Sequence, residues 1–337
     1  MKKPLLPPRL KPGDTLAFFS PSGPATYFAP KRFERAKAYF IQHGFKLRPG
    51  ALTGKSDFYR SANIRERADE FNQLVRDPDV RCLMSVVGGM NSNSLLPYID
   101  YQALRKDPKI IIGYSDLTAL LLGIHQKTGL ITFYGPAFVA SFGEFPPLVD
   151  QTFQYFQQML GQKTRTPFAL PQPSAWTDEF ISWEEQDRPK TTRPNQWLTI
   201  IPGQALGRLI GGNLNTLLGI WGSPYMPKIN PGDILFIEDS LKDAATVERS
   251  FAHLKINGVL DKIGGLILGK HEKFDHKGSQ RKPYEILLEM MAGRKIPLLA
   301  DFDCCHTHPM LTLPLGLPIK LDATRRKVTL LEPWIAA

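Results

Sequence analysis

The residues Gly113-Tyr114-Ser115-Asp116 place a serine hydroxyl between a predicted strand and a predicted helix. Lys109 to Ile112 is a β-branched run typical of a strand buried on both faces, and Leu117 to Gln126 has the leucine pattern of a helix. Ser115 therefore occupies the turn, where a sharp elbow would expose its hydroxyl and direct the following backbone N–H groups at a developing oxyanion. A Ser-Asp pair is also an ordinary helix N-cap, so both interpretations stay open at this point.

A nucleophilic serine needs a base and a carboxylate that orients the base, and the second half of the chain offers both. Glu238 ends the apolar run Ile234 to Ile237, and parallel sheets build their sites at the carboxyl ends of strands. A capping or salt-bridged acid is the alternative, and Asp239 is a second candidate. His306 and His308 lie in one proline-bounded loop, and we expect one of them to be catalytic.

Several familiar site motifs are absent or incomplete. Gly50 to Ser56 is one residue short of a phosphate-binding loop, and neither Gly-x-Gly-x-x-Gly after the first strand nor Gly-x-Ser-x-Gly occurs. The acids and histidines of 271–276 fit a solvated loop better than a metal site. Cys304 and Cys305 are rival nucleophiles, but no helix N-terminus marks them as reactive thiols. We therefore expect no metal and no cofactor.

Composition predicts a folded cytoplasmic protein. The 337 residues, 42% of them hydrophobic, can bury a large core and favour two domains. No apolar run is long enough to span a membrane, and three cysteines make no disulfide framework. The formal net charge of +10 is dispersed along the chain. This distribution disfavours nucleic-acid binding and favours mild attraction of small anionic substrates.

Strand and helix patterns alternate through the first third of the chain. Predicted strands at 15–19, 45–47, 82–87 and 109–112 are separated by amphipathic helical patterns. The fold class is therefore α/β, with an N-terminal doubly wound parallel sheet of Rossmann or flavodoxin type. We expect this domain to span 1–150, a connector 151–203, and a smaller α/β or α+β domain 204–337, in which Gly211 to Asn213 opens a helix from Leu214 to Trp221.

Between Phe142 and Pro202 the pattern dissolves into prolines, aromatics and charges, which predicts a connector with a substrate-facing loop. Trp183 lies there among charged residues, as either a packing anchor or a face on which a nucleobase could stack. Gly88 and Gly89, which follow the third strand, fit a loop whose backbone approaches a ligand closely, although a plain tight turn is the alternative.

Motifs spread over nearly the whole chain resemble the LD-carboxypeptidase family of serine peptidases. The resemblance rests on Leu10-Lys11-Pro12-Gly13-Asp14, Ser20-Pro21-Ser22-Gly23, Gly88-Gly89, Pro108-Lys109, Gly113-Tyr114-Ser115-Asp116 and Leu313-Pro314-Leu315-Gly316. It implies that Ser115 is the nucleophile, with Glu238 and His306 completing the triad. It also implies an oxyanion hole formed by the backbone N–H groups of Gly89 and Asp116.

Further motifs are similar to the branch of that family that confers immunity to microcin C. They are Gly89 to Pro97, Phe133-Tyr134-Gly135-Pro136 and Gly212 to Thr216. The resemblance implies cleavage of the amide between an aspartyl residue and a nucleotide phosphoramidate, by a protein that tends to form homodimers. We expect Asn91, Trp183 and Asn213 to contact this small peptidyl-nucleotide substrate.

Two other functions remain as alternatives. One is the removal of D-alanine from a muropeptide in peptidoglycan recycling, and the other is non-catalytic binding of nucleotide-peptide conjugates. Cys305 stands where the peptidoglycan-type pattern has glycine, and Tyr134 stands where it has histidine. Both departures weaken the peptidoglycan assignment and leave the three triad positions intact.

Overall fold

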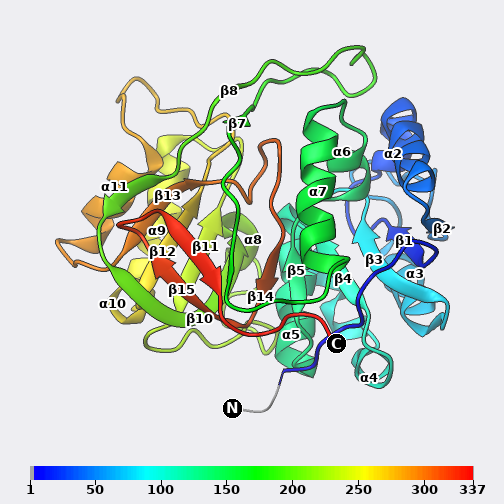
Figure 1. Cartoon of the computed structure of the whole chain (residues 1–337), viewed down its shortest axis with the longest axis horizontal. Helices are drawn as coiled ribbons and strands as arrows, with labels where there is room; N and C mark the ends of the chain where they lie inside the picture. Colours follow the sequence, from blue (N-terminus) through cyan, green and yellow to red (C-terminus); the bar gives the residue numbers. More distant parts are fainter. Residues whose placement is uncertain (1–3, 337) are drawn as a thin grey trace.

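Two β-sheets, each with its own helices, lie side by side in the computed structural model of this chain, which describes residues 4–336 (Figure 1). Their buried apolar side chains form one continuous cluster. No helix in this described part is both long and apolar enough to cross a membrane.

The first sheet has the strand order β14-β5-β4-β3-β1-β2. Its strands are β1 (Thr15–Phe19), β2 (Lys46–Pro49), β3 (Val80–Ser85), β4 (Ile110–Gly113), β5 (Thr132–Tyr134) and β14 (Leu313–Leu315). β1 to β5 run parallel, and β14 pairs antiparallel with β5. All four residues of β4 are buried, as its β-branched run predicted, because helices cover both faces of the sheet.

One helical layer contains α1 (Ala25–Phe28), α2 (Pro30–Gln42), α6 (Phe138–Phe142) and α7 (Leu148–Leu160). The other contains α3 (Ile64–Arg76), the 3₁₀ segment η1 (Ser92–Tyr98), α4 (Tyr101–Lys106) and α5 (Thr118–Thr128). The short 3₁₀ turn η2 (Ser115–Leu117) leads into α5. Figure 1 shows α6 and α7 beside α2, on the side of the sheet away from α5. The doubly wound α/β fold is confirmed.

The second sheet has the order β6-β16-β15-β10-β11-β12-β13-β9, and β10 to β13 run parallel. Its strands are β6 (Phe168–Ala169), β9 (Leu198–Ile201), β10 (Gln204–Asn213), β11 (Ile234–Glu238), β12 (Gly265–Gly269), β13 (Leu298–Phe302), β15 (Pro318–Asp322) and β16 (Lys327–Leu330). Its helices are α8 (Leu214–Leu218), α9 (Ala244–Ile256), α10 (Val259–Lys262) and α11 (Pro283–Met291). β7 (Ala175–Trp176) and β8 (Arg193–Pro194) form a separate hairpin.

The segment after residue 142 is more regular than its sequence predicted. It holds the 13-residue helix α7, whose buried face includes Phe153 and Phe156, and four short strands. The expected helix from 214 to 221 ends at Leu218, and the residues before it form the long strand β10. The glycines of this strand lowered its apparent strand propensity, so the sequence did not predict it. Neighbouring atoms leave no room for a Cβ at Gly207, Gly211 or Gly212.

The chain crosses back to the first sheet near its end. β14 lies on the edge beside β5, although its neighbours β13 and β15 belong to the second sheet. α5 also contacts α8 and β10 of the second half. The loop that carries His306, between β13 and β14, therefore connects the two sheets. The boundaries 1–150, 151–203 and 204–337 stay a prediction.

Gly211 tests how tightly β10 packs on β11. It has φ of +138°, and a Cβ there would lie 1.8 Å from the carbonyl oxygen of Phe236. We expect Gly211→Ala to lower the free energy of unfolding by roughly 2–5 kcal/mol, from backbone strain and overpacking together. Gly258→Ala is the control, because φ is +66° but no atom lies within 4 Å of its Cβ position. Equal losses in urea unfolding would contradict the close-packing explanation.

Candidate active site

Ser115 occupies the sharp turn that the sequence predicted. It follows β4 and Tyr114 and begins η2, with φ of +59°, a left-handed conformation that is costly for a residue with a Cβ. Its backbone N–H donates to the hydroxyl of Tyr134 at 3.0 Å, and its carbonyl accepts from Thr118 Oγ1 at 2.7 Å. A Cβ on Gly88 would lie 2.8 Å from Ser115 Oγ, so only glycine leaves the hydroxyl unobstructed.

The loop after β3 is held against this turn by the side chain of Asp116. Its carboxylate accepts hydrogen bonds from the backbone N–H groups of Asn91 at 3.0 Å and Ser92 at 2.8 Å. Within residues 4–336, the N–H of Gly89 has no hydrogen-bond acceptor. A Cβ on Gly88 would lie 3.2 Å from the backbone nitrogen of Asp116. The two predicted oxyanion donors therefore belong to adjoining segments beside the serine.

The side chain of Asn91 is engaged with the protein itself. Its Oδ1 accepts from Arg67 Nη1 at 2.6 Å and from Ser22 Oγ at 3.1 Å. Arg67 is buried, and its Nη1 also donates to the carbonyl of Pro21 at 2.7 Å. These bonds position the glycine loop, and a contact between Asn91 and substrate stays a prediction.

Glu238 is the last residue of β11, and its carboxylate is fully buried. Its Oε2 accepts from Nδ1 of His306 at 2.7 Å. Its Oε1 accepts from the hydroxyl of Tyr134 at 2.5 Å and from Asn213 Nδ2 at 3.0 Å. Asn213 ends the adjacent parallel strand in register with Glu238. Asn213 therefore orients the acid, and its predicted contact with substrate is untested.

The charges of His306 and Glu238 support each other. Burial alone would raise the pKa of Glu238, but His306 and the hydrogen bonds from Tyr134 and Asn213 lower it below 4.5. Burial alone would lower the pKa of His306, but the charge of Glu238 and the hydrogen bond between them raise it above 6.5. The carboxylate thus keeps its charge away from water and makes the imidazole a stronger base.

Asp239, the alternative acid, faces other partners. Its carboxylate accepts from the N–H groups of Ser240 at 2.9 Å and Asn215 at 3.2 Å. Burial and repulsion by Glu238 raise the pKa of Asp239 to about 6. Of the two acids, it is Glu238 that hydrogen bonds His306.

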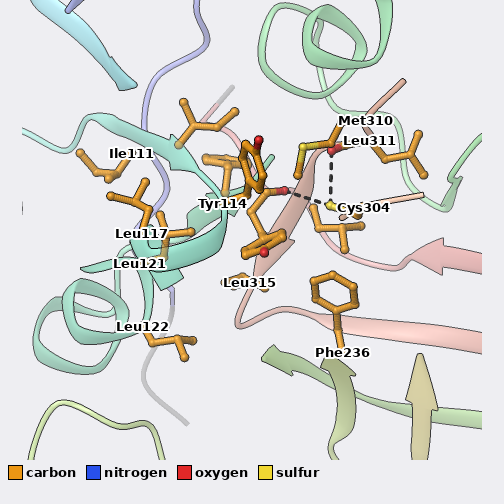
Figure 2. Close-up of a cluster of buried hydrophobic side chains, with 14 of the residues drawn as sticks. Ile111, Tyr114, Leu117, Leu121, Leu122, Phe236, Cys304, Met310, Leu311 and Leu315 are labelled. Atoms are coloured by element: carbon orange, nitrogen blue, oxygen red, sulfur yellow. Dashed lines mark hydrogen bonds between the residues drawn. The ribbon is translucent and has the colours of Figure 1, made fainter. Parts of the chain in front are cut away.

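The imidazole of His306 lies beside the serine turn. Its ring contacts that of Tyr114 edge to face, with 4.9 Å between the centroids. Figure 2 shows that Tyr114 and Leu117 of the serine turn belong to the same buried apolar cluster as Cys304 and Leu311 of the histidine loop. Cys304 donates to the carbonyl oxygens of Tyr134 and Leu311, and burial raises its pKa well above the ordinary value. Its thiol therefore serves packing.

His308 belongs to a different network. Its Nε2 lies 4.0 Å from Oε2 of Glu144, which also pairs with the buried Arg32 at 3.0 Å and with Lys190 at 3.2 Å. Burial and the nearby Lys190 lower the pKa of His308 to about 3, so its ring is neutral. The two histidines that the sequence could not separate thus have different partners.

Trp183 is half-buried where the connector crosses the first domain. Its ring stacks on Phe28 with 5.8 Å between centroids, and the guanidinium of Arg32 lies 4.9 Å from its centre. The next residue, Glu184, accepts hydrogen bonds from the first N–H groups of α2, at 3.0 Å from that of Lys31. This anchors the connector, and it leaves open the choice between packing and nucleobase recognition.

Sequence reasoning missed two residues that connect the site. Tyr134 was noted only as a departure from a pattern, yet it bonds both Ser115 and Glu238. Thr118 Oγ1 accepts from the N–H of Asn213 at 3.0 Å and so joins the turn to β10. A polar side chain at the end of β5 was the one available signal. Residues 4–336 contain no group of three or more side chains that could hold a metal.

Comparison with known families agrees with these features. The model of the LD-carboxypeptidase N-terminal domain matches residues 16–135, and that of the C-terminal domain matches residues 206–321. A protein of Vibrio cholerae that bears the name "putative carboxypeptidase" is 59% identical over 96% of this chain and 97% of its own length. The microcin C7 self-immunity protein MccF of Escherichia coli is 55% identical over 99% of this chain and 97% of its own.

Solved structures give the same relationship. MccF superposes with a TM-score of 0.97, over 99% of this chain and 100% of the other. Structures of MccF contain aspartyl sulfamoyl adenosine, glutamyl sulfamoyl guanosine or, in a tryptophan-to-phenylalanine variant, adenosine monophosphate. Muramoyltetrapeptide carboxypeptidase from Oxalobacter formigenes is more distant, with 25% identity over 96% of this chain and 100% of its own, and a TM-score of 0.74. The chain belongs to the LD-carboxypeptidase family of serine peptidases.

Proposed function

We propose that this protein is a serine hydrolase that cleaves the amide bond joining an amino acid to a nucleotide. The observation that carries the proposal is the hydrogen bond at 2.7 Å between the half-buried His306 and the fully buried Glu238, with the His306 ring packed against Tyr114, the residue before the left-handed Ser115. A nucleophile, a base and an orienting acid in this arrangement support acyl transfer. No step requires a cofactor.

The proposed mechanism gives each group a role. Because Nδ1 of His306 is bonded to Glu238, its Nε2 is the atom that takes the proton from Ser115 Oγ as the hydroxyl attacks the carbonyl carbon. The N–H groups of Gly89 and Asp116 stabilise the oxyanion. His306 then returns the proton to the leaving nitrogen, and water, activated by the same imidazole, hydrolyses the acyl-Ser115 ester.

Similarity to MccF favours an aminoacyl nucleotide over a muropeptide. MccF is far closer in sequence and in structure than the muramoyltetrapeptide carboxypeptidase, and its structures hold aminoacyl sulfamoyl nucleosides. The departures at Tyr134 and Cys305 point the same way. We propose a cytoplasmic location, because Cys82, Cys304 and Cys305 are all free thiols, which suits a reducing compartment. A homodimer also remains a prediction.

Substrate choice is tested by incubating the enzyme with two compounds side by side. One is aspartate joined by an amide bond to the phosphoramidate of AMP, and the other is a muropeptide that ends in D-alanine. We expect hydrolysis of the first, measured as released aspartate, to exceed that of the second. Faster release of D-alanine would assign the enzyme to peptidoglycan recycling.

The same assay separates an enzyme from a binding protein. Ser115→Ala should lower kcat by about 10⁴-fold while the protein stays folded, because the triad residues act as a unit. Cys304→Ala and Cys305→Ala are the controls and should keep most activity. If Ser115→Ala still protected cells from an aminoacyl-nucleotide toxin, non-catalytic binding would be the function.

The two histidines should respond differently to substitution and to pH. His306→Ala should be nearly inactive, whereas His308→Ala should retain most activity because its ring contacts Glu144 and not the triad. In the wild type, kcat/KM should rise with pH through a pKa above 6.5, since only the neutral imidazole accepts the serine proton. His308→Ala should preserve this rise. If the pH profile changed in His308→Ala and not in His306→Ala, His308 would be the general base.

Nucleobase recognition by Trp183 is tested with a substrate that lacks the base. If a base stacks on the indole, Trp183→Ala loses about 1–3 kcal/mol and KM for the aspartyl nucleotide rises roughly 5- to 150-fold. An aspartyl phosphoramidate that carries methyl in place of the nucleoside should show little change. Trp183→Phe, which keeps an aromatic face, is the matched control. Equal losses with both substrates would show that the tryptophan only packs against Phe28 and Arg32.

A further inference from the structure

The hydroxyl of Tyr134 touches both halves of the proposed triad. It accepts a hydrogen bond from the backbone N–H of Ser115 at 3.0 Å and donates one to Oε1 of Glu238 at 2.5 Å. Tyr134 ends β5 of the first sheet, and Glu238 ends β11 of the second. Both side chains are fully buried, so water does not compete for these bonds. One hydroxyl therefore joins the nucleophile's turn to the acid across the two sheets.

We propose that Tyr134 is a positioning residue, which holds Ser115 in its left-handed turn and Glu238 in the orientation that His306 requires. The inference rests on the proposed function only in that Ser115, His306 and Glu238 form the triad, and it is independent of the substrate. Tyr134 itself exchanges no proton. Burial and the charge of Glu238 raise its pKa well above the ordinary value, so it remains a donor at every working pH.

The effect on the base follows from competition for one negative charge. Tyr134 and Asn213 donate hydrogen bonds to Oε1 of Glu238, and these bonds weaken the carboxylate as an acceptor for His306, which donates to Oε2. Without the Tyr134 donor, the carboxylate would hold a protonated imidazole more firmly, and the pKa of His306 would rise further. Loss of the same hydroxyl would also leave the N–H of Ser115 without its acceptor.

Other charged or titratable groups also face His306, but Tyr134→Phe changes none of them directly. Glu272 and Asp239 raise its pKa further. His271 and His308 lie close enough to feel its charge, and burial lowers their pKa values to about 4 and about 3, so both are neutral. A shift on removal of the hydroxyl can therefore be assigned to Glu238.

The test compares Tyr134→Phe with Tyr101→Phe. The control also removes one tyrosine hydroxyl, which donates to the carbonyl of Leu96 at 2.7 Å outside the site. A fluorophosphonate reports the reactivity of Ser115 without any natural substrate, and nitrogen NMR of labelled histidine reports the titration of His306. We expect Tyr134→Phe to slow labelling by about 10- to 100-fold and to move the titration of His306 to higher pH. Tyr101→Phe should change neither.

A second variant covers the case in which Tyr134→Phe does not fold. Site-specific 3-fluorotyrosine at position 134 keeps the hydroxyl and makes it a stronger donor, so the titration of His306 should move to lower pH. An unchanged titration in this variant, or slower labelling without any shift in Tyr134→Phe, would overturn the positioning role. Failure of the aspartyl nucleotide as a substrate would leave both readouts intact, so the two proposals fail separately.

Discussion

A carboxylate that stays ionised without contact with water is the constraint on which the site of this protein depends. Burying such a charge costs several kcal/mol unless hydrogen bonds and an opposite charge compensate it. Glu238 receives three donors, and the imidazole of His306 supplies a countercharge whenever it is protonated. Removing any one of them leaves the charge less compensated, so the acid and its partners form a cooperative unit.

The partners of Glu238 come from separate parts of the chain, and the fold brings them to one place. Asn213 ends the neighbouring strand of the same sheet, whereas Tyr134 ends a strand of the other sheet. The loop that bears His306 starts after β13 of the second sheet and returns through β14 to the first. Two hydrogen bonds fix this loop. The N–H of Leu311 donates to the backbone carbonyl of Asp303 at 2.9 Å and closes the base of the loop, and the N–H of Met310 donates to Thr152 Oγ1 in α7 at 3.2 Å.

Local signals explain what could be predicted from the sequence. The β-branched run before Gly113, the strand-end position of Glu238 and the alternation of strand and helix patterns each depend on neighbouring residues, and the structure reproduces them. The strand β10 escaped prediction, because Gly207, Gly211 and Gly212 lower its apparent propensity, yet neighbouring atoms exclude a Cβ from each position. The helix α7 escaped because prolines and charges surround it.

Contacts between distant segments could not be predicted in this way. No local pattern states that Tyr134 meets Glu238, or that His306 and His308, two residues apart, join different networks. Family resemblance chose between the histidines, and the structure supplies the physical difference: the carboxylate of Glu238 bonds His306, whereas His308 lies near a Glu144 already paired with Arg32. Such distinctions depend on tertiary structure alone.

The central claim is that an acyl group passes through Ser115, and rapid-quench mass spectrometry tests it most directly. The enzyme would be mixed with the aspartyl phosphoramidate of AMP, stopped in acid within milliseconds, digested and mapped. The account predicts an aspartyl ester on the peptide that contains Ser115, formed and lost at rates compatible with turnover. An adduct on Cys304 or Cys305, or turnover without any acyl group detected on Ser115 even at low temperature, would contradict it.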